Sequence, residues 1–309
     1  MSQYYSMLDT TNWYVSSIDV FVLANSPDDR ALEMANRLAS NQTKINYILV
    51  IQYQNIANNM ISKLFPDSEI NVITANNNQV DFLNQLRCLQ SKFSVDSRLV
   101  VDVSCIHTPE MFTLLKFFRS SCSKERVQVA YSVPFDYDFP EEPFVSYHSY
   151  YGDLITKDLL GYGGLSDGKA HSQMIVFLGF EGVLSAKVIE DIQYDDLVLV
   201  NNLPSFFPKY KDISVINNYD IITSHHSKLR YVPANNPFET YNFLNVVLDR
   251  SDRECVAPLS TKPVALGVCL YALNHDLLRV VYPMSDEYNQ HSTNKVYKTY
   301  FYDIPLFCA

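Results

Sequence analysis

The residues best suited to chemistry form a short polar turn, Leu259-Ser260-Thr261-Lys262-Pro263, between an apolar run and a helical pattern. Two hydroxyls, one ammonium group and the free N–H groups of a helix start would face the same space. Such helix starts favour phosphate or carboxylate, and a lysine placed there is unfavourable unless an anion compensates it. We therefore predict that Ser260, Thr261 and Lys262 bind a small anion. The alternative is a Ser/Thr cap beside a solvated lysine.

A second polar turn, residues 102–109, occupies the matching place in the first half of the chain. Asp102 ends a predicted strand, and Ser104, His107 and Thr108 line the turn before a helical pattern. We predict that Ser104 and Thr108 contact a ligand, while His107 is suited to acid–base chemistry or to ligand binding. The alternative is that these are ordinary turn residues.

The segment 179–182 follows another apolar run and has a GxxG spacing, which alone is a weak sign of a phosphate loop. The Glu181 carboxylate would repel phosphate, so a ribose hydroxyl or a substrate proton suits it better. The alternative is a helix-start carboxylate that the helix dipole favours. If the protein is an enzyme, Glu181, Asp102 and His107 are its candidate catalytic residues.

Glycine is scarce in this chain, and seven of the eight glycines lie between Gly152 and Gly182. The loop 161–168 holds several of them, which predicts either a hinge or a backbone that approaches a ligand closely. In the second case Gly163 and Gly164 contact the ligand.

Two tyrosines, Tyr131 and Tyr282, are predicted to end corresponding strands of the two halves. Aromatic rings in such places can stack on nucleobases, so both are candidate ligand contacts. With 22 tyrosines in the chain, ordinary packing is the alternative.

Short β-branched runs alternate with helical patterns along the chain, which indicates an α/β fold with parallel sheets. The predicted strands lie near 18–23, 46–51, 69–73, 98–103, 126–131, 173–179, 196–200, 213–216, 254–258 and 278–282. The predicted helices lie near 28–40, 53–64, 78–93, 109–120, 182–190, 237–249 and 263–273. The tail 295–302 alternates in polarity, which predicts an antiparallel edge strand.

The two halves repeat several markers in the same order, which predicts two Rossmann-like units related by internal duplication. Ala75-Asn76-Asn77 recurs as Ala234-Asn235-Asn236, and the helix start Thr108-Pro109 recurs as Lys262-Pro263. We predict an N-terminal Rossmann-like lobe (1–134), a connector rich in Pro, Tyr and Gly (135–172) and a C-terminal Rossmann-like lobe (173–309). A duplicated molecule of this kind is expected to bind its ligand where the halves meet.

Composition excludes several classes of function. The 309 residues, 47% of them hydrophobic, support a full core but include no run of membrane-spanning length. A net charge of −10 argues against general nucleic-acid binding. The first residues resemble no signal peptide and the six cysteines are dispersed, so we expect a cytoplasmic protein without disulfide or zinc. No Walker, HExxH or nucleophile-elbow motif is present in the sequence, so we expect the protein to have no metal and no cofactor.

The strand–Ser260-Thr261-Lys262–helix turn, together with two such units in one chain, resembles CRISPR-associated Rossmann-fold (CARF) sensors and SAVED domains. The glycines usual in that turn are replaced here by Pro258 and Leu259. The resemblance implies paired lobes that bind a cyclic oligonucleotide, and a place in bacterial antiviral defence.

The leading hypothesis from the sequence is a two-lobed binding protein for a nucleotide or similar small anion, acting as a sensor or as part of a protein complex. One alternative is a hydrolase or transferase that acts on a nucleotide-like substrate. Another is a scaffold subunit without a small ligand, whose tyrosine-rich surface packs on a protein partner.

Overall fold

A computed structural model describes most of the chain and divides it into two compact units. The first unit comprises Met1–Asp138 and Gln290–Ala309, and the second comprises Phe139–Asn289. The described residues are 7–9, 13, 15–53, 59–76, 78–137, 150–151, 154–164, 171–224, 228–248, 253–284, 287–288 and 293–307.

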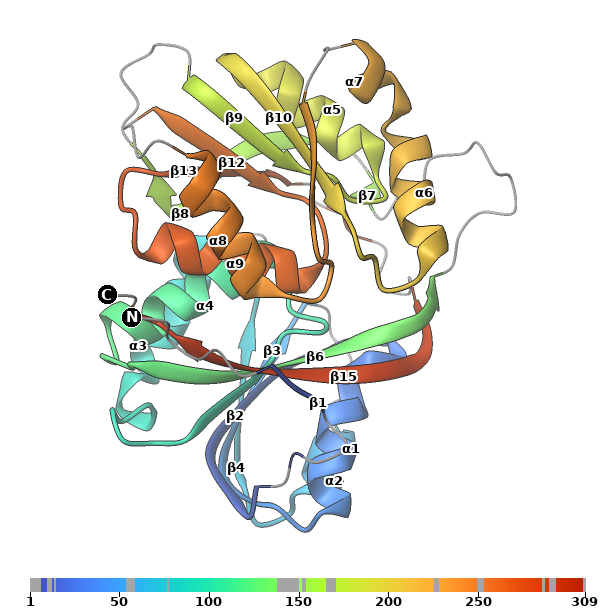
Figure 1. Cartoon of the computed structure of the whole chain (residues 1–309). Coiled ribbons are helices and arrows are strands. Elements are labelled where there is room, and N and C mark those ends of the chain that lie inside the picture. Colours follow the sequence, from blue (N-terminus) through green and yellow to red (C-terminus); the bar gives the residue numbers. More distant parts are fainter. Residues whose placement is uncertain are drawn as a thin grey trace. The chain divides into compact units, whose positions relative to one another are not determined.

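The first unit contains a seven-stranded sheet with the order β1-β15-β6-β5-β2-β3-β4. Its strands are β1 (Met7–Asp9), β2 (Ser17–Asn25), β3 (Lys44–Gln52), β4 (Glu69–Thr74), β5 (Leu99–Asp102), β6 (Arg126–Tyr137) and β15 (Thr293–Pro305). Strands β2 to β6 are parallel, whereas β15 runs antiparallel between β6 and β1. Figure 1 shows β6 and β15 as two long neighbouring strands.

Helices cover both faces of this first sheet. They are η2 (Asp29–Leu32), α1 (Glu33–Ser40), α2 (Asn59–Leu64), α3 (Gln79–Cys88), η3 (Gln90–Lys92) and α4 (Thr108–Ser120). Helices α1 and α2 pack together on one face, and α3 and α4 pack together on the other (Figure 1). This is the arrangement that right-handed crossovers give on either side of the first strand.

The second unit contains a six-stranded sheet with the order β11-β10-β9-β12-β13-β8. Its strands are β8 (Ile155–Gly163), β9 (His171–Phe177), β10 (Tyr194–Asn202), β11 (Lys228–Val232), β12 (Glu254–Pro258) and β13 (Arg279–Met284). Two short strands, β7 (Tyr150–Tyr151) and β14 (Glu287–Tyr288), pair separately. Strands β9 to β13 are parallel, and β8 runs antiparallel to β13.

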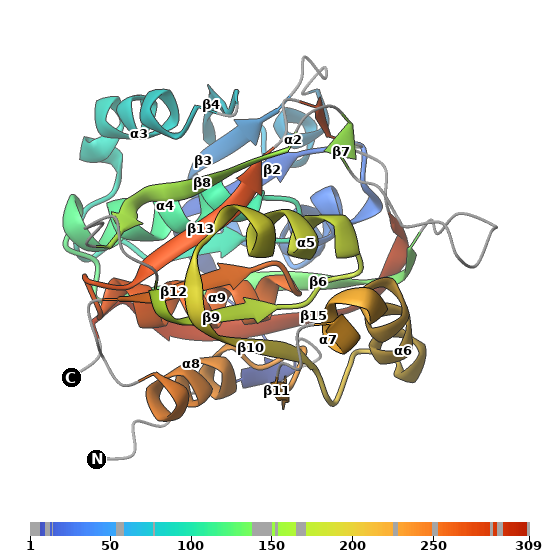
Figure 2. The same ribbon diagram turned by 90° about the horizontal axis from the view of Figure 1, so that it is seen from above.

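The helices of the second unit also lie on both faces of its sheet. They are α5 (Gly182–Asp191), α6 (Pro208–Asn217), α7 (Tyr219–Ser224), α8 (Pro237–Val247) and α9 (Lys262–Leu273). Figure 2 shows α5, α6 and α7 on one face, while α8 and α9 pack together on the opposite face.

The two sheets have the same topology, which confirms the prediction of two Rossmann-like units. Within each unit the first five strands run in the order 3-2-1-4-5, the doubly wound arrangement, and an antiparallel sixth strand lies beside the fifth. Helices α4 and α9 both connect the fourth strand to the fifth. Thr108-Pro109 and Lys262-Pro263 therefore begin equivalent helices, as predicted.

Local details repeat as well. Asn78 precedes α3 and Asn236 precedes α8, and each side chain accepts hydrogen bonds from two N–H groups of the first turn. Upstream, Ala75 N donates to Gln52 O at 2.9 Å and Ala234 N donates to Pro204 O at 2.9 Å. The alanine of the repeated marker therefore has the same role in both units, whereas the capping asparagine belongs to the marker only in the second unit, since Asn78 lies one residue beyond the first marker. Asn77, the last residue of the first marker, lies outside the described residues.

The sixth strands are exchanged between the units. The chain leaves β6 of the first unit and supplies β8 to the second, and it leaves β13 of the second unit and supplies β15 to the first. The predicted boundaries thus differ from the observed ones: Gln290–Ala309 belongs to the first unit, because β15 pairs with β6 along almost its whole length. The predicted connector 135–172 contains β7 and β8 as well.

Two further predictions need correction. Residues 213–216 form part of α6 rather than a strand, and the third strand of the second unit is β11 instead. Pro208 lies in the first turn of α6 and Asn218 ends it, and these signals outweigh the β-branched run between them. The predicted tail strand is antiparallel, but it is no edge at Tyr300–Tyr302, because β1 pairs with it there.

Each unit has its own apolar core. In the first, Trp13, Phe21, Ile48 and Phe301 belong to one buried cluster, and in the second a separate cluster surrounds Val176 and Leu199. Every residue of helix α9 from Pro263 to Leu273 is buried. At Gly267 an added Cβ would lie 2.3 Å from Pro237 O, so only glycine permits this approach of α9 to α8.

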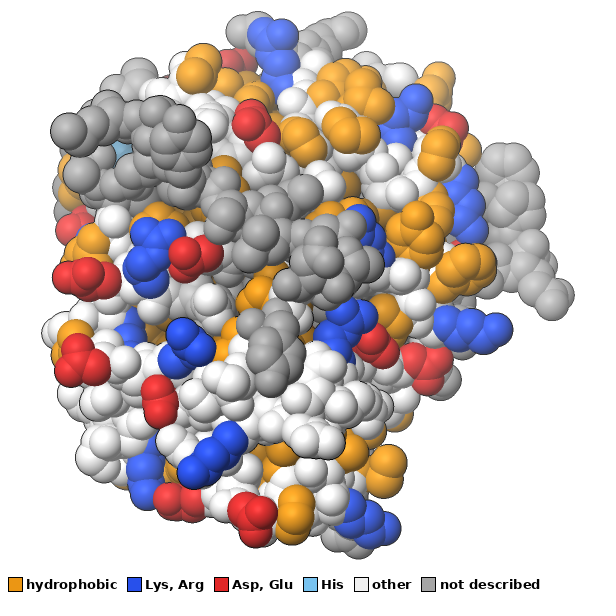
Figure 3. Space-filling view, turned by 60° about the horizontal axis from the view of Figure 1, so that its bottom comes forward, with side chains coloured by type: hydrophobic (Ala, Val, Ile, Leu, Met, Phe, Trp, Pro, Cys, Tyr) orange, Lys and Arg blue, Asp and Glu red, His pale blue; other side chains and the backbone are white. Residues whose placement is uncertain are grey.

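The charge distribution on one face and the state of the described thiols are as follows. On the face shown in Figure 3, lysines and arginines are interspersed with acidic side chains instead of forming one basic surface. The five cysteines in the described ranges are all free thiols; Cys308 lies outside those ranges. Among the described helices, none combines the length and the apolar character that crossing a bilayer requires.

The exchanged strand gives a first testable prediction. Trp13, the one tryptophan of the sequence, stacks on Phe301 of β15 with 3.9 Å between ring centroids. Deleting residues 290–309 should expose Trp13 and the edge of β6, because both lose their partner. We expect a red-shifted tryptophan emission and faster amide exchange across β6, while β9 and β10 stay protected. A synthetic peptide of residues 290–309 should restore the emission, and unchanged emission after the deletion would contradict the assignment.

Candidate functional site

The candidate site residues lie at the topological switch point of each sheet. The helices that follow the first and fourth strands leave on opposite faces, and doubly wound sheets bind ligands in the crevice this opens. The switch point falls between β2 and β5 in the first unit and between β9 and β12 in the second. The turn at Ser260 follows β12, and the turn at residues 102–109 follows β5.

Helix α9 begins as the sequence predicts, but its cap is unusual. Thr261 is the N-cap residue with an extended backbone (φ −64°, ψ 156°), and Pro263 lies in the first turn. The Thr261 side chain makes no capping hydrogen bond; its hydroxyl instead donates to Ala234 O at 2.7 Å. The first turn carries no acidic residue. The Thr261 side chain therefore does not cap the first turn of α9.

Asn202, at the end of β10, holds the neighbouring hydroxyl. Its Nδ2 donates to Ser260 Oγ at 2.6 Å, which occupies a lone pair of Ser260 and leaves the hydroxyl proton to point elsewhere. The residue is 8% exposed, and its Oδ1 is buried with no hydrogen-bond partner among the described residues. Ser260 and Lys262 are half-buried.

The turn after β9 is fixed by the end of α6 and the residue after it. Ser214 and Asn218 both donate to Gly179 O, at 2.9 and 3.0 Å, and Asn217 donates to Phe180 O at 2.6 Å. Glu181 is the N-cap residue of α5 but makes no capping hydrogen bond.

The GxxG spacing has a packing explanation. A Cβ on Gly179 would lie 2.3 Å from Leu259 O, and a Cβ on Gly182 would lie 1.9 Å from Asn217 O. Both glycines are therefore required by close backbone approach within the second unit, independently of any phosphate.

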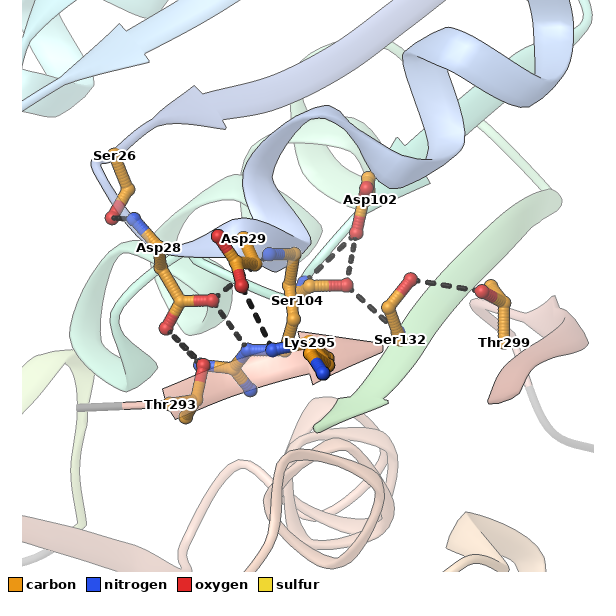
Figure 4. A network of polar contacts seen from close by, with 10 residues as sticks. Ser26, Asp28, Asp29, Asp102, Ser104, Ser132, Thr293, Lys295 and Thr299 are labelled. Atoms are coloured by element: carbon orange, nitrogen blue, oxygen red, sulfur yellow. Dashed lines mark hydrogen bonds and ion pairs between the residues drawn. The ribbon is translucent and has the colours of Figure 1, made fainter. Parts of the chain in front are cut away.

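In the first unit, Asp102 lies at the centre of a buried polar network (Figure 4). Ser104 donates to Asp102 Oδ1 from both its backbone N, at 3.0 Å, and its hydroxyl, at 2.5 Å. Ser132 N donates to Ser104 Oγ at 2.8 Å, and the Ser132 hydroxyl lies 2.9 Å from Thr299 Oγ1. Ser104 is 2% exposed, so its hydroxyl is engaged on both sides and is unsuited to act as a nucleophile.

A buried ion pair adjoins this network. Arg30 makes a two-point contact with Asp28, Nε to Oδ1 and Nη2 to Oδ2, each at 2.9 Å. Thr293 of β15 donates to Asp28 Oδ2 at 2.7 Å, and Lys295 N donates to Asp29 Oδ2 at 2.8 Å. These contacts attach β15 to the turn that follows β2 (Figure 4).

The start of α4 is closed by an aromatic residue. His107 is the N-cap, with φ −66° and ψ 154°, nearly the same backbone conformation as Thr261. Its N–H donates to the Tyr53 hydroxyl at 2.8 Å, and its ring stacks on Tyr53 with 3.8 Å between centroids. Thr108 and Glu110, in the first turn, are both buried.

The remaining predicted contacts have structural surroundings. Tyr131 and Tyr282 lie inside β6 and β13 rather than at their ends, and both side chains are buried. Gly163 ends β8. Gly164 has a φ of +60°, and a Cβ there would lie 2.8 Å from Leu277 O. The second half of the predicted loop, 165–168, lies outside the described residues.

The structure distributes the catalytic candidates over the two units. Asp102 and His107 belong to one turn of the first unit, and Glu181 belongs to the second. Within the described ranges, no group of three or more His, Cys, Asp or Glu side chains is arranged to hold a metal ion.

Comparison with known proteins adds no relative. No family model matches the chain, and no curated protein matches its sequence.

The buried carboxyl gives a second prediction. Burial raises the pKa of Asp102 to about 6, against the opposing effect of the Ser104 hydrogen bonds and Arg30. The folded state thus binds this proton more tightly than the unfolded state, so the carboxyl lowers stability as the pH rises from about 4 to 6. The Asp102→Asn variant should therefore gain stability relative to the unmodified protein as the pH rises. The difference between their free energies of unfolding should change by about 2–3 kcal/mol in favour of the variant from pH 4 to pH 7.

Urea unfolding followed by Trp13 fluorescence measures this difference. Thr299→Val is the matched control, because it removes a neutral hydroxyl from the same network and should cost about 1 kcal/mol at every pH. A constant difference for Asp102→Asn would show that the carboxyl does not titrate in this range.

Proposed function

We propose that this protein is a cytosolic sensor that binds a small anionic ligand of the nucleotide class at the start of α9. The ligand phosphate accepts a hydrogen bond from the Ser260 hydroxyl and lies at the positive end of the α9 dipole, and Lys262 supplies the opposite charge. Charge-assisted hydrogen bonds of this kind are about twice as strong as neutral ones.

The hydrogen bonding of the Thr261 hydroxyl is the main support for this proposal. In an ordinary Ser/Thr cap, the side-chain oxygen accepts from an N–H of the first turn and so satisfies it. Thr261 makes no such bond and directs its proton to Ala234 O, while the first turn contains Lys262 and no acid. A helix start left uncapped beside a lysine is stabilised by an external anion.

A nucleotide fits better than a simple anion. One polar group beside Ser260, the Asn202 side chain at the end of β10, has a buried amide oxygen with no partner among the described residues, and this oxygen can accept from a hydroxyl or an amino group. The doubly wound topology and the resemblance to CARF and SAVED sensors favour a nucleotide, in particular a cyclic oligonucleotide. On this proposal the protein is a ligand-dependent component of a bacterial defence complex.

The third prediction tests the anion site. Lys262→Ala should weaken the binding of adenosine 5′-monophosphate or cyclic tri-adenylate at least tenfold, about 1.4 kcal/mol, and Ser260→Ala should weaken it severalfold. Isothermal titration calorimetry measures both, with adenosine as the ligand that lacks phosphate.

Lys187→Ala is the matched control, because Lys187 is a lysine of the same unit that is paired with Asp191 on α5. Its affinity should stay within twofold of the unmodified protein. Native mass spectrometry of the purified protein then identifies any ligand retained from the cell. If neither phosphate ligand binds and none is retained, the scaffold alternative is favoured.

A further inference from the structure

The equivalent turns of the two units allow a direct comparison. His107 and Thr261 are N-cap residues of equivalent helices with nearly the same backbone angles, so Thr108 corresponds to Lys262. Each turn also contains a serine, Ser104 or Ser260, hydrogen-bonded to a buried polar side chain at the end of a strand. In the first unit that side chain is Asp102, whereas in the second it is Asn202.

In the first unit, the donors that would hold an anion are already used. The His107 N–H donates to Tyr53, and both the N–H and the hydroxyl of Ser104 donate to Asp102. Arg30 directs two of its N–H groups to Asp28. These donors of the turn thus find partners within the protein, although Asp102 Oδ2 is buried with no hydrogen-bond partner among the described residues.

Three segments at the switch point of the first unit also carry buried carboxyl groups. Asp28, Asp102 and Glu110 are 5%, 2% and 3% exposed, and they occupy the turn after β2, the end of β5 and the first turn of α4. Like charges at short range in a buried place repel strongly. An anion at this switch point would meet these carboxyl groups, and the cation there, Arg30, is already paired with Asp28.

The second unit has the opposite chemistry. Lys262 lies where the first unit has Thr108. The serine of this turn is bonded to a neutral amide from β10, that of Asn202, whereas Ser104 is bonded to a carboxyl from the strand before its own turn, that of Asp102. Asn202 Nδ2 donates to Ser260, and Oδ1 is buried without a partner among the described residues. An amide that donates to the serine frees its proton, whereas a carboxylate there would accept that proton and withdraw it from a ligand.

We propose that, of the two described switch points, the one in the second unit is the anion site, with Asn202 as the residue that positions the Ser260 hydroxyl. The equivalent place in the first unit has become an anchor for β15, through Thr293 on Asp28 and through Thr299 on Ser132. This inference rests on the proposed function. It assigns the ligand to the second unit and requires the Ser260 hydroxyl proton to point toward the ligand.

The fourth prediction exchanges the two buried side chains. Asn202→Asp should weaken the binding of cyclic tri-adenylate at least tenfold, because the carboxylate takes the Ser260 proton and repels phosphate. Asp102→Asn, the reciprocal change, should leave affinity within twofold and should create no second site. Thr108→Val, a change of similar volume in the first unit, should also leave affinity unchanged. Calorimetry should give one ligand per chain for every variant that binds.

A positioning role makes a further demand on the Asn202→Asp protein. Its thermal unfolding midpoint should stay close to that of the unmodified protein while its affinity falls, and Asn202→Ser, which retains a hydroxyl donor of smaller size, should recover part of the affinity. Two ligands per chain, or weaker binding in Thr108→Val, would overturn the single-site inference and leave the proposed function standing. Absence of binding by the unmodified protein would overturn both.

Discussion

The antiparallel ladder between β6 and β15 is the interaction on which the first unit depends. It runs from Thr293 opposite Tyr137 to Pro305 opposite Arg126. It completes a sheet in which β2 to β6 follow one another along the chain. The polar network is built on this ladder, because Asp28 and Ser132 both use partners on β15. Trp13 also packs against it through Phe301. The sheet, the polar network and the Trp13 packing of the first unit are therefore complete only when β15 is paired with β6.

Much of the fold could be predicted because parallel strands buried on both faces read as short apolar runs. Strands β2, β3, β5 and β12 fall where the sequence placed them, and α4 and α9 begin at the repeated proline positions. The third strand of the second unit was missed for a local reason: Lys228–Val232 lacks a β-branched run, and residues 213–216, which have one, lie between helix signals. The exchange was missed because β8 pairs with β13 and β15 pairs with β6, and the local sequence of an antiparallel strand does not indicate which strand it will pair with.

The candidate site could be predicted in part. The turns at Ser260 and Ser104 were found because hydroxyls, a lysine and helix starts occur together after apolar runs. Asn202 was not, although an Asn-Asn pair at the end of a predicted strand was a usable signal. What no pattern could supply is the direction of each hydroxyl proton, since Thr261 and Ser260 differ in this respect only through partners elsewhere in the sequence.

The exchange of strands also orders events during synthesis. The ribosome completes β2 to β6 first, but β15 emerges only after every strand and helix of the second unit. During that interval β6 has an unpaired edge, and such an edge is open to pairing with another chain. The second unit has no such delay at its last strand, because β8 is synthesised before β13 and is already present when β13 emerges. The half made first is therefore the half finished last, and a nascent chain of this protein depends on protection of one strand edge until translation has passed residue 305.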